Sequence, residues 1–215
     1  MTKIPATISH SGLKLHKACN TGLRRFEQHF PVEMFDTFER VSLLGCLKVC
    51  TAADVFWAMQ TSPHIVALAE VAHLMIADIF QLIADDTNHK LFIRTYFGQL
   101  ADHWRAENFR AVSCLKPDFE LGSDFFFFNS YYTSHEQRHY NFGNFFEAGK
   151  LNLLGCIATW LSTDACFASE FDEKLRGVIR KYLCHGDGYK FPIGLELIKP
   201  MNLVVRAEEW IPDED

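Results

Sequence analysis

The sequence of 215 residues lacks most of the segments that would place it outside the globular class. It contains no low-complexity tract, and its 7 prolines and 12 glycines are too few for a flexible linker protein. Residues 1–7 lack the apolar core of a secretory signal, and no run reaches the roughly 18 apolar residues that span a bilayer. A hydrophobic share of 48% can fill a core, so we expect a globular, cytoplasmic protein without a membrane anchor.

Positive charge is also scarce. The 21 Lys and Arg residues are outnumbered by 27 Asp and Glu residues, which gives a formal net charge of −6. This balance argues against direct binding to nucleic acid or to an anionic membrane. It favours a protein partner with a basic surface instead.

The motifs of common nucleotide-binding and hydrolase folds are missing as well. The chain has no G-x-x-x-x-G-K, G-x-G-x-x-G or G-x-S-x-G segment, so phosphate loops, dinucleotide folds and serine elbows lack support. Its seven cysteines are odd in number and include no C-x-x-C pair. We interpret them as reduced thiols in the core. Cys46 and Cys50 are one helical turn apart, but without a second pair buried packing is the better interpretation than a metal site.

Apolar periodicity predicts a helical array in the first half of the chain. Thr51-Ala52-Ala53-Asp54 resembles an acidic capping box, and the helix that it opens should close at Ser62-Pro63. The widest apolar stripe extends from Ile65 to Ile83 over five turns. The expected helices cover about 21–30, 36–49, 51–62, 65–83 and 91–110, with a turn at 85–88 before the last.

The second half mixes strands and helices. Phe119–Leu121 and Phe125–Phe128 flank Gly122-Ser123, which predicts a β-hairpin, and apolar stripes predict helices over 151–161 and, after a Ser169 cap, 171–183. Two further strands are expected at 194–198 and 201–205. The predicted fold is α+β and mainly helical: an N-terminal helical array, a β-hairpin, two further helices and C-terminal strands. We expect a helical module over 1–112 and an α+β region over 113–215, packed as one unit.

Residues 14–112 carry a resemblance to a known module. The segments Ala18-Cys19-Asn20-Thr21-Gly22-Leu23-Arg24-Arg25-Phe26 and Thr51–Met59, followed by the stripe Leu68–Phe80, are similar to a helical module of small phage and bacterial proteins, some of which are described as immunity proteins. The resemblance implies a phage or mobile-element context. It brings no catalytic residues with it.

One segment of the second half matches a catalytic motif. His135-Glu136-Gln137-Arg138-His139 has the H-E-x-x-H form and resembles the motif of zinc metallopeptidases. On a helix both imidazoles lie on one face and can bind a single Zn²⁺, while Glu136 acts as general base on the bound water. Such a site would hydrolyse an amide bond.

A zinc site needs a third protein ligand, which the sequence does not select. Glu170 is the preferred ligand, by analogy with metallopeptidases that take it from a separate helix, and Asp164, Asp172 and Glu173 are alternatives. Glu147 would be about 12 Å along a straight helix from His139, beyond reach unless Gly143 breaks it. The other interpretation makes His135 and His139 polar members of an aromatic surface.

Aromatic residues are abundant around that motif. The 20 phenylalanines exceed what a core usually needs, and residues 125–146 combine aromatic rings with polar groups as interface hot spots do. The alternative is a sheet buried between two helical layers. The candidate interface residues are Phe126, Phe128, Tyr131, Tyr132, Tyr140, Phe142 and Phe145.

These observations favour a non-enzymatic interaction protein of phage or mobile-element type. It would inhibit a host defence factor or a toxin by binding and occluding it through segment 125–146, without a cofactor. The alternative is a small zinc metallopeptidase that uses His135, His139 and Glu170 as ligands and Glu136 as base. A third hypothesis is a homo-oligomer in which the aromatic face pairs with itself.

Overall fold

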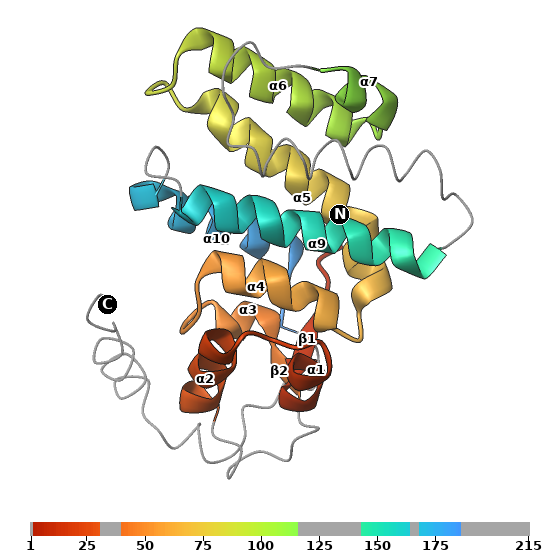
Figure 1. Cartoon of the computed structure of the whole chain (residues 1–215), viewed down its shortest axis with the longest axis vertical. Helices are drawn as coiled ribbons and strands as arrows, with labels where there is room; N and C mark the ends of the chain where they lie inside the picture. Colours follow the sequence, from red (N-terminus) through yellow and green to blue (C-terminus); the bar gives the residue numbers. More distant parts are fainter. Residues whose placement is uncertain (1, 31–39, 116–142, 164–167, 186–215) are drawn as a thin grey trace.

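Helices dominate the computed structural model, which describes residues 2–30, 40–115, 143–163 and 168–185 (Figure 1). The described elements are, in chain order, β1 (Thr7–Ser9), α1 (His10–Leu15), α2 (Asn20–His29), β2 (Arg40–Ser42), α3 (Leu43–Cys46), α4 (Ala52–Ala58), the 3-10 turn η1 (Met59–Thr61), α5 (Ile65–Asp85), α6 (Leu91–Arg105), α7 (Phe109–Cys114), α9 (Gly143–Thr163) and α10 (Ala168–Tyr182). The mainly helical character is therefore confirmed.

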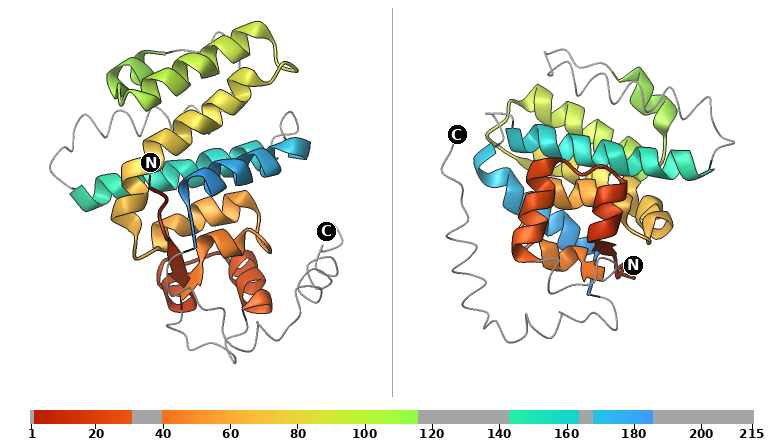
Figure 2. Two further views of the ribbon diagram at one scale, coloured as in Figure 1. Left: turned by 180° about the vertical axis from the view of Figure 1, so that it is seen from behind. Right: turned by 60° about the horizontal axis from the view of Figure 1, so that its bottom comes forward.

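Helix α5 is the centre of the packing. Its predicted apolar stripe is buried from Leu68 to Ile83, and Ile65 is half-buried. Helix α5 contacts α6 on one side and α9 and α10 on the other (Figure 2). The core that it anchors continues through α4 to Leu154 of α9 and Ile179 of α10, so helices from both halves of the sequence share one core. By length and composition α5 could cross a membrane, but ten of its residues are buried in this core.

The end of α5 forms the turn expected at 85–88. Asp86 Oδ1 accepts a hydrogen bond from the Asn88 backbone N–H at 3.0 Å, and Asp86 Oδ2 accepts one from Lys174 of α10 at 3.0 Å. Both bonds stabilise the carboxylate and lower the pKa of Asp86. The turn thus connects α5 to α6 and also ties both to α10.

Helix α4 begins at the predicted capping box. The Thr51 hydroxyl accepts from the Asp54 N–H at 3.2 Å, and Asp54 Oδ2 accepts from the Thr51 N–H at 3.2 Å. The helix continues as η1 and closes at Ser62, whose Oγ donates to the Thr7 carbonyl at 2.7 Å. The expected start and end of this segment are confirmed.

Helices α4 and α9 cross at very short range. A Cβ placed on Gly155 of α9 would lie 3.3 Å from the Trp57 Cα of α4, which is closer than most side chains tolerate. A side chain at this position would require the α4 backbone to shift by a few tenths of an ångström. Gly177 of α10, by contrast, faces open space, and a Cβ added there would meet no atom within 4 Å.

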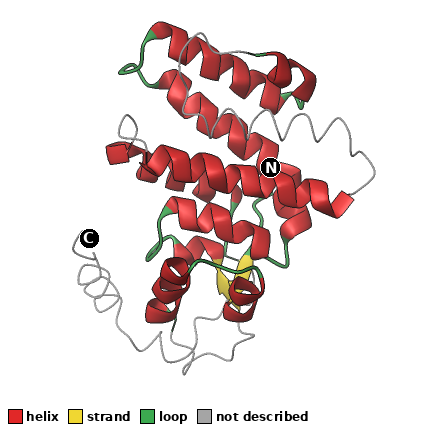
Figure 3. Cartoon of the chain, viewed as in Figure 1, coloured by secondary structure: helices red, strands yellow, loops and turns green. Residues whose placement is uncertain are grey.

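The described sheet has two strands and was not predicted (Figure 3). Strands β1 and β2 pair antiparallel with Ile8 opposite Val41, and both side chains are buried. The helix expected over 36–49 is therefore wrong at 40–42, because pairing with a distant strand outweighs local helix periodicity. It is also wrong at 47–49, because the short helix α3 ends at Cys46. Ser42 ends the strand and caps the short helix α3 by accepting from the Gly45 N–H.

The helix expected over 91–110 is also interrupted. Helix α6 ends at Arg105, Glu107 adopts a left-handed conformation with φ of 52°, and Asn108 caps α7 by accepting from the Ala111 N–H at 3.2 Å. The helices α9 and α10 contain most of the two helices expected over 151–161 and 171–183, but α9 begins earlier, at Gly143, and the expected Ser169 cap is wrong, because Ser169 lies inside α10. The predicted hairpin at 119–128 and the strands at 194–198 and 201–205 lie outside the described residues.

The two helix glycines give a direct test of the α4–α9 crossing. We expect Gly155→Ala to lower the free energy of unfolding by roughly 1 kcal/mol, because the new methyl group meets backbone. Gly177→Ala is the matched control and should raise it by about 0.5–1 kcal/mol, since alanine favours a helix and nothing obstructs it. Chemical denaturation of both variants measures the two changes. Equal stabilisation by both would contradict the close crossing.

Candidate functional site

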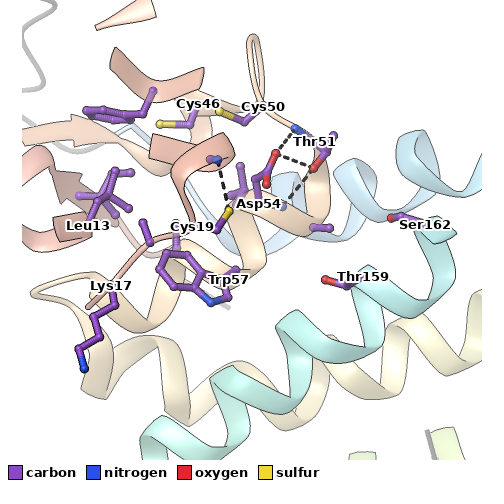
Figure 4. A pocket seen from close by; sticks show the side chains of 17 residues that line it. Leu13, Lys17, Cys19, Cys46, Cys50, Thr51, Asp54, Trp57, Thr159 and Ser162 are labelled. Carbon is purple, nitrogen blue, oxygen red and sulfur yellow. Dashed lines mark hydrogen bonds between the residues drawn. The ribbon is translucent and has the colours of Figure 1, made fainter. Parts of the chain in front are cut away.

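A cavity of about 510 Å³ opens between α1, α2, α4 and α9 (Figure 4). Its walls come from segments that are far apart in the sequence: the N-terminal helices, the start of α4 and the last turns of α9. The apolar part of the wall includes Leu13, Phe26, Val55 and Trp57. Leu13, Phe26 and Val55 are buried and form its interior, whereas Trp57 is half-buried.

Three thiols also line this cavity. All six described cysteines are free, but Cys19 is exposed at the N-cap of α2, where its Sγ accepts from the Gly22 N–H at 3.3 Å. Cys46 is buried and Cys50 is half-buried. The expectation of core thiols therefore holds for Cys46 and is wrong for Cys19 and Cys114, which are exposed.

Burial makes the two inner thiols poor nucleophiles. It raises the pKa of Cys46 well above its usual range and raises the pKa of Cys50 to about 12, with a smaller contribution to the latter from the Asp54 carboxylate. Both thiols remain protonated near neutral pH, and a thiol reacts only as the thiolate. The described residues contain no group of three His, Cys, Asp or Glu side chains arranged to hold a metal ion.

Asp54 is the main polar group of the cavity wall. Its Oδ2 accepts from the Thr51 N–H, from the Thr51 hydroxyl at 2.8 Å, and from Arg25 Nη1 at 3.0 Å. Arg25 thereby ties α2 to α4. On the opposite wall, Ser162 of α9 donates its hydroxyl proton to the Ala158 carbonyl at 2.8 Å.

The start of α4 is held from outside the cavity by α10. Asp172 Oδ1 accepts from the Ala52 N–H at 2.8 Å, and Asp172 Oδ2 accepts from Arg176 Nε at 2.5 Å. The Arg176 guanidinium also donates to the carbonyls of Leu47 and Cys50, the latter at 2.8 Å. One arginine and one aspartate thus satisfy three backbone groups of segment 47–52.

These contacts bear on the candidate zinc ligands of α10. Asp172 is bonded to Arg176 and to backbone, and Glu173 pairs with Arg180. Both carboxylates are therefore already paired with arginine side chains in this arrangement. Glu170 lies in α10, but its side chain is outside the part of the structure that is described, as is Asp164 altogether.

The remaining predicted site residues fall in the same undescribed regions. The motif residues His135, Glu136 and His139 lie outside the described residues, and so do six of the interface residues, namely Phe126, Phe128, Tyr131, Tyr132, Tyr140 and Phe142. Phe145 lies in the first part of α9, where side chains are not described. The zinc site and the aromatic interface therefore stay predictions.

The cavity has little signature in the sequence. Its best signals are the capping box at Thr51 and the Cys19 to Phe26 segment, which form two of its walls. Neither of these two signals indicates a cavity by itself, because the third wall, from Thr159 to Ser162, is more than 100 residues away along the chain. Comparison with protein-family models, curated proteins and solved structures finds no match for this chain.

Proposed function

We propose that this chain is an interaction protein of phage or mobile-element type that inhibits a host defence factor or a toxin by binding and occluding it. The resemblance of residues 14–112 to the phage and bacterial module supports the context. The acidic net charge of −6 supports a partner with a basic surface, which it would attract and orient during encounter. Free thiols suit the reducing cytoplasm, where we place the protein.

The observation that carries this proposal is how the described charged groups are used. Asp78 of α5 accepts from the Tyr182 hydroxyl at 2.7 Å and from Lys181 at 2.5 Å, and Asp86 accepts from Lys174. With the Asp172–Arg176 pair, these contacts fasten α10 to α4 and α5. These charged groups hold helices together. Such a use is more typical of a scaffold that presents a binding surface than of a catalytic site.

A neutralisation assay tests the proposal. The protein is co-expressed with a panel of toxins and defence systems, and cell growth or phage plating is measured. We expect at least one member of the panel to be neutralised. The Phe126→Ser or Tyr131→Ser variant, purified, should bind that member at least tenfold more weakly than the wild type does, with unchanged helicity. Leu91→Ser, at a side chain of 75% exposure on α6, is the control and should bind as the wild type does. Failure to neutralise any member, or loss of neutralisation in Glu136→Gln, would contradict the occlusion model.

The H-E-x-x-H motif keeps a second function as a proposal, a small zinc metallopeptidase. Metal analysis of the purified full chain tests it directly. A peptidase should carry about one equivalent of zinc through His135, His139 and Glu170, and the His135→Ala, His139→Ala double variant should lose it. The occlusion model expects no stoichiometric zinc in either protein, and the same low content in both would exclude the peptidase.

A further inference from the structure

We propose that the cavity between α1, α2, α4 and α9 binds a small molecule with an apolar body and a hydrogen-bond-donating, cationic group. The proposal rests on the cavity and does not depend on the proposed inhibitory function. Its volume of about 510 Å³ falls within the range of small-molecule sites, which bury most of their ligand in an apolar enclosure with a few placed polar groups.

The apolar body is indicated by the inner wall. Leu13, Phe26 and Val55 are buried in the core and line the cavity. Trp57 of α4 lines it as well (Figure 4). An aromatic or aliphatic group placed there would remove apolar surface from water, at about 25 cal/mol per Å². The Trp57 ring also provides a face on which a flat ligand can stack.

The donating group is indicated by the hydrogen bonds around Asp54. Within the described part of the chain, the hydrogen bonds to its carboxylate from Arg25 and Thr51 all end on Oδ2, which leaves Oδ1 available as an acceptor. The hydroxyl proton beside this carboxylate is already committed, because Thr51 donates to Asp54, and on the opposite wall Ser162 donates to the Ala158 carbonyl. Beside the Asp54 carboxylate the cavity therefore offers an acceptor, and a ligand group bonded to it must bring the proton.

Charge separates the two ends of the cavity. Lys17 is an exposed donor of the lining, and its ammonium group points away from Asp54 in Figure 4. Arg25 pairs with Asp54 Oδ2 and is not itself part of the lining. A cationic group seated beside Oδ1 would gain a charge-assisted hydrogen bond, whereas a carboxylate in the same position would face another carboxylate.

Two fluorescent probes with the same aromatic body test the proposal. Dansylcadaverine carries an amine and dansylglycine carries a carboxylate, and fluorescence titration of the full chain measures the affinity of each. We expect saturable binding of dansylcadaverine with a blue-shifted emission, at least fivefold tighter than that of dansylglycine. Asp54→Asn, which can retain the helix cap, should reduce this preference to less than twofold.

Cavity-filling variants locate the probe. Ala53→Phe, on the α4 wall, and Ser162→Leu, on the α9 wall, should each weaken dansylcadaverine binding at least tenfold. Ala67→Phe is the matched control, because Ala67 is also a half-buried helical alanine but does not line the cavity. It should bind as the wild type does. Circular dichroism identifies any variant that fails to fold. If one cavity-filling variant does not fold, the binding measured for the other one tests the site.

Protection of Cys19 provides an independent readout. Cys19 and Cys114 are both exposed, but only Cys19 lines the cavity. Saturating dansylcadaverine should slow alkylation of Cys19 by N-ethylmaleimide at least fivefold and leave Cys114 unchanged. Non-saturable binding, or equal binding by the wild type and by folded cavity-filling variants, would overturn the site. Equal or tighter binding of dansylglycine would overturn the ligand class. Neither result depends on the neutralisation assay.

Discussion

The contact between α10 and the start of α4 is the constraint on which the rest of the structure depends. Arg176 donates to the carbonyls of Leu47 and Cys50, while Asp172 accepts from the Ala52 N–H. These groups belong to the connection between α3 and α4, where backbone groups have no helical partner. The two side chains supply those partners from more than 100 residues away, so the direction of α4 depends on α10 being in place.

The position of α4 in turn determines both the core and the cavity. One face of α4 packs against α9 at the Gly155 crossing, and Thr51, Asp54 and Trp57 line the cavity. The charged side chains at this junction bond to neighbouring helices. Asp54 both caps α4 and lines the cavity. This arrangement suits a rigid scaffold that binds other molecules, and it is the physical basis of the binding functions proposed for the chain.

Features set by neighbouring residues could be predicted from the sequence, and those set by distant contacts could not. The capping box at Thr51 and the stripe of α5 follow from residues within one or two turns, and both are confirmed. Strand β2 could not be predicted, because it forms by pairing Val41 with Ile8, and this pairing is not visible in the sequence around Val41. The cavity could not be predicted for the same reason, since three distant stretches of the chain form it. Gly155 within an apolar helix is a usable sign of a close helix crossing.

Hydrogen exchange at the Ala52 amide tests the central claim, because this amide is bonded to Asp172 and Asp172 is held by Arg176. Arg176→Met should speed exchange of the Ala52 amide at least tenfold and lower the free energy of unfolding by about 2 kcal/mol, since two backbone carbonyls lose a charged donor. Arg180→Met removes an exposed ion pair with Glu173 on the same helix and should leave both quantities close to those of the wild type. Equal effects of the two substitutions would contradict the account.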